Sequence, residues 1–437
     1  MRFVSLLCAA PLVSASIIPV HQALDSRDAV VNETAQAVPK ANKRFSLGEV
    51  PNVDYKGGDA PLELIKAHTK YQSELPPWLR SVVESNPDLS SKFKSYLQMG
   101  GDAGMTGTVS ASPPAFYDVQ YVVPADIGTP PQRTFLNLDT GSSDLWTFSS
   151  DTYQPQVRNQ ILYRPQDSST SELLNGESWS IRYGDGAEAS GIVYQDRVAL
   201  GGVHFDQQGV QSAVQVSSAI SGDSFSSGIM GMAYTSGANT VRPTKQKTFA
   251  ENIRDELESP VFTVNLQKGR PGNYNFGFID ELEHTGKIAY TKITDNAAFW
   301  KVPIAGYQVG DRTFRQYAWE GIVDTGTTLL LVPDDMVNDY YSAILGARYD
   351  PRVGMVVFPC DASVPDFKFG FGNFRGVIPG NYVRYGQYTG SDCFGGIQSS
   401  EGIGMAIIGD VLIKAQLVVF DMGNGTVGFA NKQLSSD

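Results

Sequence analysis

Short apolar runs alternate with turn-forming residues over most of the chain after about residue 106. Glycine, valine, serine and threonine recur between these runs, and tyrosine and phenylalanine are plentiful. Short runs bounded by turn residues are typical of strands, whereas few stretches have the spacing of a long helix. The pattern predicts a mostly β protein. The clearest strand-like runs are 119–123, 262–266, 355–358 and 417–420, and the best helical periods are 248–257 and 334–345.

Residues 16–105 have a different texture. Lysines and acidic residues are interspersed, strand patterns are scarce, and residues 61–67 and the spacing of Phe93 and Leu97 predict helices. This segment has 10 Lys and Arg against 11 Asp and Glu, while residues 106–437 have 23 against 35. A near-neutral leader before an acidic body predicts a prosegment that docks by charge and leaves when the acids protonate. The alternative interpretation is a disordered tail.

The junction between leader and body carries cleavage signals. Residues 99–104 are rich in glycine, which predicts a flexible link and maturation near 100–107. The dibasic pair at 43–44 is a second candidate.

The first residues resemble a secretory signal. A short charged start is followed by an apolar run over 3–13 and then by small residues, which predicts cleavage near Ala15. No later segment is long and apolar enough to span a membrane, so a soluble, secreted protein is expected. Cys8 leaves with the signal. Cys360 and Cys393 remain in an oxidising compartment, which favours one disulfide over two separate buried thiols.

The composition argues against several classes of function. The net charge of −12 and the pI near 4.9 give no basic stripe of the kind that nucleic-acid binding requires. The acidity fits either an ordinary soluble surface or adaptation to acid. With four histidines and no paired-histidine zinc motif, no metal and no cofactor are expected. Residues 222–226 lack the second glycine of a serine nucleophile elbow.

One motif occurs twice. Residues 136–146 (LNLDTGSSDLW) run from an apolar strand into Asp-Thr-Gly, and residues 321–329 (GIVDTGTTL) repeat this order. In each half an apolar run ending in glycine follows at a similar interval, at Gly231 and Gly409. Two elements repeated in the same order predict an internal duplication. A pseudo-two-fold arrangement would then bring Asp139 and Asp324 together between two lobes.

Paired carboxyl groups suit the hydrolysis of a peptide bond. Two close carboxyl groups hold one proton between them, so the ionised member can take a proton from water and the protonated member can bond the peptide carbonyl. The residues beside the aspartates suit this chemistry: Thr140 and Thr325 can lock the loops, Gly141 and Gly326 allow close approach, and Ser142 and Thr327 can bond the outer carboxylate oxygens.

These motifs resemble the pepsin-like aspartic peptidases, and most of all the secreted fungal branch. The resemblance runs from about 117 to 429, nearly the whole proposed mature chain. Besides both Asp-Thr-Gly motifs it includes 127–132, 179–186, 259–262, 276–280, 393–398 and 408–411.

The resemblance implies a bilobal pepsin-like acid protease fold with the active-site cleft between the lobes. It implies that Asp139 and Asp324 are catalytic, that Tyr183 belongs to a hairpin flap that closes over substrate, and that Trp146 packs with it. An acidic residue at Asp185 implies tolerance of lysine before the cleaved bond, although Ala187 replaces the serine of such relatives. The expected peptide contacts are Tyr183, Gly184, Asp185, Gly141, Gly326, Thr327 and Thr328.

The leader also matches the family. Lys70 and Tyr71 resemble the lysine-tyrosine pair of family prosegments, which implies that Lys70 plugs the site as a cation between the two acids; the alternative is a solvated lysine.

Two glycosylation sequons begin at Asn32 and at Asn424, the latter in an expected hairpin turn.

Together these features predict a secreted aspartic endopeptidase made as a zymogen, active at acid pH and favouring large apolar residues around the cleaved bond. A vacuolar destination is the alternative. Expected partners are protein and peptide substrates and the chain's own prosegment, with no nucleic acid or membrane, for a monomer. A rival is a catalytically inactive binding or inhibitory protein on the same fold. The expected division is a signal peptide at 1–15, a prosegment at 16–105 and lobes at 106–285 and 286–437.

Overall fold

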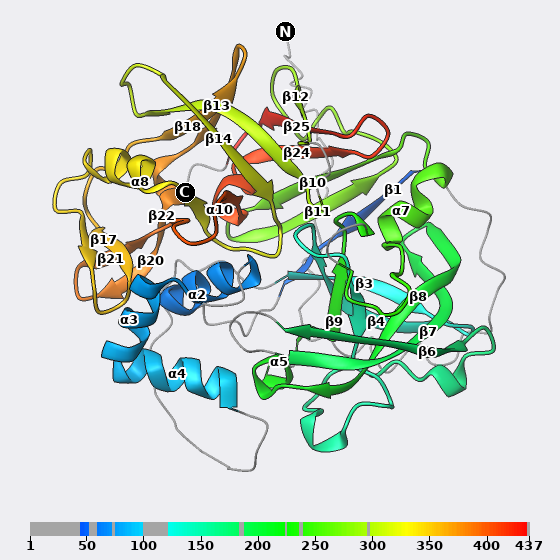
Figure 1. Ribbon diagram of the computed structural model, residues 1–437. Helices are drawn as coiled ribbons and strands as arrows, with labels where there is room; N and C mark the ends of the chain where they lie inside the picture. Colours follow the sequence, from blue (N-terminus) through cyan, green and yellow to red (C-terminus); the bar gives the residue numbers. More distant parts are fainter. Residues whose placement is uncertain are drawn as a thin grey trace, which may run out of the picture. The chain divides into compact units, whose positions relative to one another are not determined.

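The chain folds mostly into β-strands, as predicted (Figure 1). The computed structural model describes residues 44–51, 59–71, 75–98, 121–182, 188–222, 225–235, 239–294 and 298–434. Among these residues the strands form four sheets. The helices are α2 (Ala60–Tyr71), α3 (Pro77–Ser85), α4 (Pro87–Gln98), α5 (Ser218–Gly222), α7 (Phe249–Ile253), α8 (Asp334–Tyr341), α9 (Gly380–Val383) and α10 (Asp410–Ile413), with 3₁₀ turns at Gln154–Gln156, Pro165–Asp167 and Arg254–Glu256.

Each half of the body supplies one large sheet. In spatial order, the first contains β2 (Val50–Pro51), β3 (Tyr121–Ile127), β4 (Gln132–Asp139), β9 (Gly228–Gly231), β5 (Leu145–Thr147), β8 (Val203–Val216), β7 (Glu188–Leu200) and β6 (Glu172–Arg182). The second contains β19 (Phe374–Ile378), β18 (Phe367–Phe371), β13 (Lys301–Val309), β14 (Arg315–Val323), β23 (Ala406–Ile408), β15 (Leu330–Val332) and β22 (Ile397–Ser399).

The strand pairings confirm the internal duplication. In the first sheet β4 runs parallel to β9, β9 antiparallel to β5, and β5 parallel to β8. In the second sheet β14 runs parallel to β23, β23 antiparallel to β15, and β15 parallel to β22. The same four-strand pattern therefore occurs in both sheets, and each copy of the Asp-Thr-Gly motif lies at the equivalent point of its sheet.

The repeated glycine is required by close packing in both halves. A Cβ on Gly231 would lie 2.6 Å from the backbone N of Asp144 and the backbone O of Ser142. A Cβ on Gly409 would lie 2.3 Å from the backbone O atoms of Thr327 and Leu329. In each half the glycine lets its strand press against the loop that follows the aspartate, which explains why both recur together.

A six-stranded sheet combines strands from both halves with a strand of the leader. Its order is β1 (Phe45–Gly48), β11 (Arg270–Phe276), β10 (Val261–Gln267), β24 (Gln416–Asp421), β25 (Thr426–Asn431) and β12 (Ala289–Lys292). β1 pairs antiparallel with β11, and the Phe45 ring stacks on Phe276 with centroids 4.8 Å apart. The leader thus contains edge strands that its own sequence pattern did not indicate.

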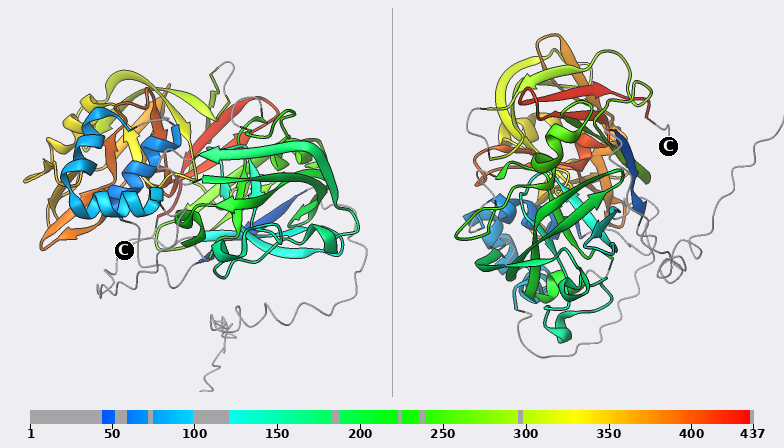
Figure 2. Two further views of the ribbon diagram at one scale, coloured as in Figure 1. Left: turned by 60° about the horizontal axis from the view of Figure 1, so that its bottom comes forward. Right: turned by 90° about the vertical axis from the view of Figure 1, so that its right-hand side faces the viewer.

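The helices predicted in the leader are present. The run 61–67 lies within α2, and Phe93 and Leu97 lie within α4. The helices pack on the second half (Figure 2), where Leu64, Ile65 and Leu79 share an apolar cluster with residues of β14, β15 and β17 (Met355–Pro359). Helix α2 therefore packs its apolar side chains on the second half of the body.

Two helices of the body are shorter than their sequence patterns. Within 248–257, α7 covers Phe249–Ile253 and then tightens into the 3₁₀ turn, after a capping box formed by Thr248 and Glu251. Within 334–345, α8 ends at Tyr341. The sequon at Asn424 lies in the loop between β24 and β25, where the exposed Asn424 amide donates to Asp421 at 2.7 Å.

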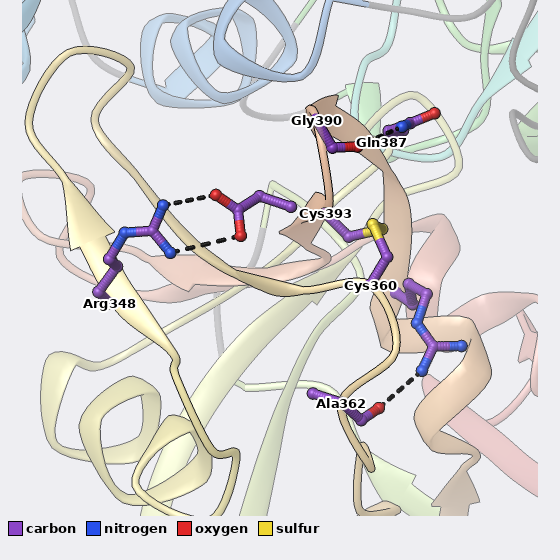
Figure 3. Close-up of a disulfide and its surroundings, with 8 residues drawn as sticks. Arg348, Cys360, Ala362, Gln387, Gly390 and Cys393 are labelled. Atoms are coloured by element: carbon purple, nitrogen blue, oxygen red, sulfur yellow. Dashed lines mark hydrogen bonds and ion pairs between the residues drawn. A yellow bond between two sulfur atoms is a disulfide. The ribbon is translucent and has the colours of Figure 1, made fainter.

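A small sheet holds the disulfide (Figure 3). Its order is β16 (Arg348–Asp350), β17 (Met355–Pro359), β21 (Asp392–Gly395) and β20 (Arg384–Thr389). Cys360 and Cys393 are bonded, with Cα atoms 5.0 Å apart, so the interpretation as two separate thiols is wrong. Arg348 pairs with Asp392 at 2.6 Å beside the bridge, and the Arg384 guanidinium donates to Ala362 O at 2.9 Å.

We expect Gly231→Ala and Gly409→Ala to destabilise the protein alike, because each Cβ would collide with backbone atoms that cannot move aside. The free energy of unfolding should fall by about 1–3 kcal/mol in each variant. Gly222→Ala, where a Cβ meets nothing within 4 Å, is the matched control and should change it by less than about 0.5 kcal/mol. Unfolding in denaturant measures all three, and two unaffected motif variants would contradict the packing argument.

Candidate active site

The two motif aspartates come from equivalent loop positions and meet. Asp139 is the last residue of β4, and Asp324 follows β14 directly. Both are buried, with 3% and 0% of their surface exposed. Each backbone is fixed by the neighbouring strand, since Met232 N donates to Asp139 O at 2.8 Å and Asp324 N donates to Ile408 O at 3.0 Å. The duplication therefore delivers two carboxyl groups to one buried centre.

The two threonines cross-link the loops from opposite halves. Thr140 N donates to Thr325 Oγ1 at 3.1 Å, and Thr325 N donates to Thr140 Oγ1 at 3.0 Å. The Thr140 hydroxyl donates to Val323 O at 2.9 Å, and the Thr325 hydroxyl donates to Leu138 O at 2.7 Å. All four bonds connect one half to the other, so they fix the position of one aspartate relative to the other.

The two glycines of the motifs lie against the carboxyl groups. Gly141 N donates to Asp139 Oδ1, and Gly326 N donates to Asp324 Oδ1, each at 2.9 Å. A Cβ on Gly141 would lie 2.3 Å from Asp324 Oδ1, and one on Gly326 would lie 2.4 Å from Asp139 Oδ1. Each glycine thus bonds its own aspartate and faces the carboxyl group of the other half. Any larger residue would separate the pair.

The end of helix α2 occupies the centre. Lys70 Nζ donates to Asp139 Oδ1 at 2.8 Å and to Asp324 Oδ1 and Oδ2 at 2.9 and 3.0 Å. The Tyr71 hydroxyl donates to Asp324 Oδ2 at 2.7 Å. One ammonium group therefore bridges both carboxyl groups, and the Tyr71 hydroxyl is a further donor to Asp324.

The carboxyl groups differ in pKa. Burial raises the pKa of Asp139, and nearby Asp324 adds to this, against the opposing charge of Lys70. Burial also opposes ionisation of Asp324, but Lys70 and the bonds from Asp139 and Thr327 outweigh it and lower the pKa to about 2. For Lys70, burial is outweighed by the two carboxylates, so its pKa is raised. The pKa values of the two carboxyl groups are therefore shifted in opposite directions.

The hydroxyl residues after the motifs differ between the halves. Thr327 donates to Asp324 Oδ2. Thr328 donates to Glu63 of α2 at 3.3 Å. The Ser142 hydroxyl is buried and makes no hydrogen bond with a described residue, so the expected bond to Asp139 is not made here. Asp139 Oδ1 instead accepts from Lys70 and Gly141.

The expected flap is only partly described. Strands β6 and β7 form an antiparallel hairpin up to Arg182 and Glu188. Tyr183, Gly184 and Asp185 lie outside the described residues. Trp146 is buried and stacks on Trp179 of β6 with ring centroids 6.0 Å apart.

Two leader contacts with this centre were not predicted from the sequence. Tyr71 was expected only as part of a family pair, and Glu63 had no expected role. A tyrosine next to the expected plug lysine was the one available signal, since helical spacing cannot show what a side chain meets. Within the described residues no group of three or more His, Cys, Asp or Glu side chains could hold a metal ion, and no helix has the length and apolarity to cross a bilayer.

The sequence is similar to that of known proteins. The profile of the eukaryotic aspartyl protease family matches residues 120–432. Endothiapepsin of Cryphonectria parasitica is 44% identical over 392 residues, covering 89% of this chain and 90% of its own. Podosporapepsin of Podospora anserina is 45% identical, covering 89% and 94%, and penicillopepsin-1 of Talaromyces stipitatus is 40% identical, covering 90% and 94%.

The chain belongs to the eukaryotic aspartyl protease family. The predicted family and bilobal fold are confirmed, and the enzyme class is that of the peptide-bond hydrolases. The rival interpretation of an inactive binding protein finds no support among these relatives.

We expect Thr140→Val to lower the free energy of unfolding by about 1–3 kcal/mol, because it removes the acceptor of the buried Thr325 N–H and the donor to Val323 O. Thr140→Ser keeps the hydroxyl and is the matched control. Thermal unfolding of both variants measures the effect. Equal stability of the two variants would show that the crossed bonds do not hold the halves together.

Proposed function

We propose that the chain is a secreted aspartic endopeptidase, made as an inactive precursor, in which Asp139 and Asp324 activate a water molecule. The observation that carries this is the pair of buried carboxyl groups bridged by one lysine of the leader. A pair of close carboxyl groups attracts a cation such as the Lys70 ammonium group. When no cation is bound, the pair holds a single proton. The family assignment supports the same chemistry.

The mechanism follows from the shared proton. The ionised carboxyl removes a proton from a water held between the two, and the water oxygen adds to the peptide carbonyl carbon. The protonated carboxyl donates to the carbonyl oxygen, whose negative charge grows as the bond forms. The carbon–nitrogen bond then breaks as the pair gives a proton to the leaving amine and recovers one from a hydroxyl of the diol, which becomes the product carboxyl group. Only water and the peptide are consumed, and the two aspartates return to their starting state.

The neighbouring residues hold the pair and the peptide. Thr140, Thr325 and the buried Trp146 position the loops, and Ser142 supports the first loop once Lys70 has left. Gly141 and Gly326 leave room for the peptide backbone, and Thr327 and Thr328 offer hydroxyl groups to it. The roles of Tyr183, Gly184 and Asp185, including tolerance of lysine, stay predictions from family resemblance, as does the preference for large apolar residues.

The leader acts as an intramolecular inhibitor in this proposal. Residues 16–105 form the prosegment, with a signal at 1–15 before it and the lobes 106–285 and 286–437 after it. The proposal is supported by α2, which fills the catalytic centre with Lys70 and Tyr71, and by β1, which adds an edge to the six-stranded sheet. Secretion follows from the N-terminal apolar run, with a vacuolar destination as the alternative, and the enzyme acts as a monomer.

Asp139→Asn should reduce kcat for an acid-cleaved peptide by roughly 10²–10⁴-fold, because an amide cannot exchange the proton that the pair shares. The variant precursor is first processed by immobilised wild-type enzyme, and intact mass confirms the product. Asp206→Asn, an exposed change on β8, is the control and should leave kcat unchanged. Undiminished cleavage by the Asp139 variant would remove the proposed function.

Lys70→Met should open the precursor at neutral pH, because it keeps the apolar stem but removes the charge that bridges two acids. At pH 7 the full-length variant should bind a fluorescent statine-type inhibitor at least ~10-fold more tightly than the wild-type precursor. Lys66→Met, on the exposed side of the same helix, is the control. If both precursors exclude the inhibitor equally, Lys70 is not the plug.

A further inference from the structure

His68 is completely buried where α2 meets the body of the enzyme. It lies two residues before Lys70 and has 0% of its surface exposed. Its Nε2 is 2.9 Å from Ser399 O in β22, and its ring meets the Trp78 ring of α3 edge-on with centroids 5.4 Å apart. The bridging lysine and this histidine are therefore fixed by the same helix.

The hydrogen bonding of His68 defines its neutral form. A carbonyl oxygen can only accept, so Nε2 carries the proton and Nδ1 is the free position. Nδ1 is buried and has no hydrogen-bond partner among the described residues. A second proton would therefore place an unpaired N–H and a positive charge inside the interface, and both are unfavourable there.

Few charges face His68. Asp334 of α8 favours its charged form, but the Asp334 carboxylate already accepts from the Ser399 hydroxyl. Glu401, after β22, contacts Ser399 only through its backbone N–H. On α2 itself, Glu63 and Lys66 pair with each other at 2.9 Å. The contribution from α3 is the uncharged Trp78.

Burial therefore outweighs the Ser399 bond and Asp334, and lowers the pKa of His68 from 6.5 to about 4. In an undocked, solvated helix the ordinary value applies. Above pH 6.5 both states are neutral and docking has its full strength. As the pH falls below 6.5 the undocked state binds the proton first, so docking weakens until the pH reaches 4. The two values differ by about 2.5, which corresponds to about 300-fold in the docking equilibrium.

The ion pair between Lys70 and Asp324 does not supply this response. The low pKa of Asp324, about 2, keeps that ion pair intact through the same range of pH. A contact that is stable at neutral pH and is lost in mild acid has to bind a proton between these two pH values. The buried position of His68 in the interface gives it this property.

We propose that His68 is the acid-sensitive contact of the prosegment, and that its protonation releases α2, and Lys70 with it, from the two aspartates. This inference rests on the proposed function, because it concerns how that same site is exposed. It differs from release by protonation of carboxylates, since the proton that matters is bound by the leader.

The test compares wild-type, His68→Gln and His68→Leu precursors. Glutamine can still donate to Ser399 O, leucine fits the apolar surroundings, and neither titrates. His204→Gln, at a partly buried histidine of β8, is the matched control. The apparent Kd of a labelled statine-type inhibitor is measured for each full-length precursor within seconds of mixing at pH 4.5 to 7. It is divided by the Kd for the processed enzyme at the same pH, which removes titrations of the catalytic pair.

For wild type and His204→Gln, this ratio should fall about 40-fold more between pH 6.5 and 4.5 than for either His68 variant. Comparing slopes removes any uniform loosening caused by the substitutions. Equal slopes in all four proteins, with tight binding to the processed enzyme, would overturn the role of His68 and leave the proposed function standing. Failure of the inhibitor to bind the processed enzyme would overturn the proposed function itself.

Discussion

Two carboxyl groups buried against one another are the constraint around which the protein is organised. Water solvates an ionised carboxylate far better than a protein interior does, so such a pair persists only where donors surround it and one proton or cation offsets the charge. Backbone N–H groups of Gly141 and Gly326 supply donors, and the crossed hydroxyl bonds of Thr140 and Thr325 prevent the loops from separating. In this structure, Lys70 supplies the cation.

The duplication makes this arrangement attainable. The strands pair in the same way in the two halves. In each half, the loop that carries Asp-Thr-Gly packs against a glycine whose lack of a side chain permits close backbone packing. Because the two loops are equivalent and adjacent, the end of helix α2 contacts both aspartates at once through Lys70. In the proposed zymogen, inhibition and catalysis depend on the same geometry. Burial raises the pKa of the Asp139 carboxyl and lowers the pKa of the His68 imidazole.

What the sequence could predict was either local or repeated. The Asp-Thr-Gly motifs, the glycines 231 and 409 and the cysteine pair carry their meaning in residue type and order. By contrast, β1 forms a strand because it pairs with the edge strand β11, which lies far away in the sequence. The sequence pattern also does not distinguish His68 from other helical residues, because its contacts with Ser399 and Trp78 form only in the folded protein. The Ser142 hydroxyl, expected to bond Asp139, makes no hydrogen bond with a described residue, and Asp139 instead accepts from Lys70 over a long sequence separation.

Dependence of kcat/KM on pH in the fully processed enzyme probes the shared proton itself. A pair that must hold one proton is inactive when it holds two and when it holds none, so the profile should be bell-shaped, with both limbs set by the pair. Asp206→Asn should leave both limbs in place. A profile that stays flat, or that falls on one side only between pH 2 and pH 7, would contradict joint action of Asp139 and Asp324.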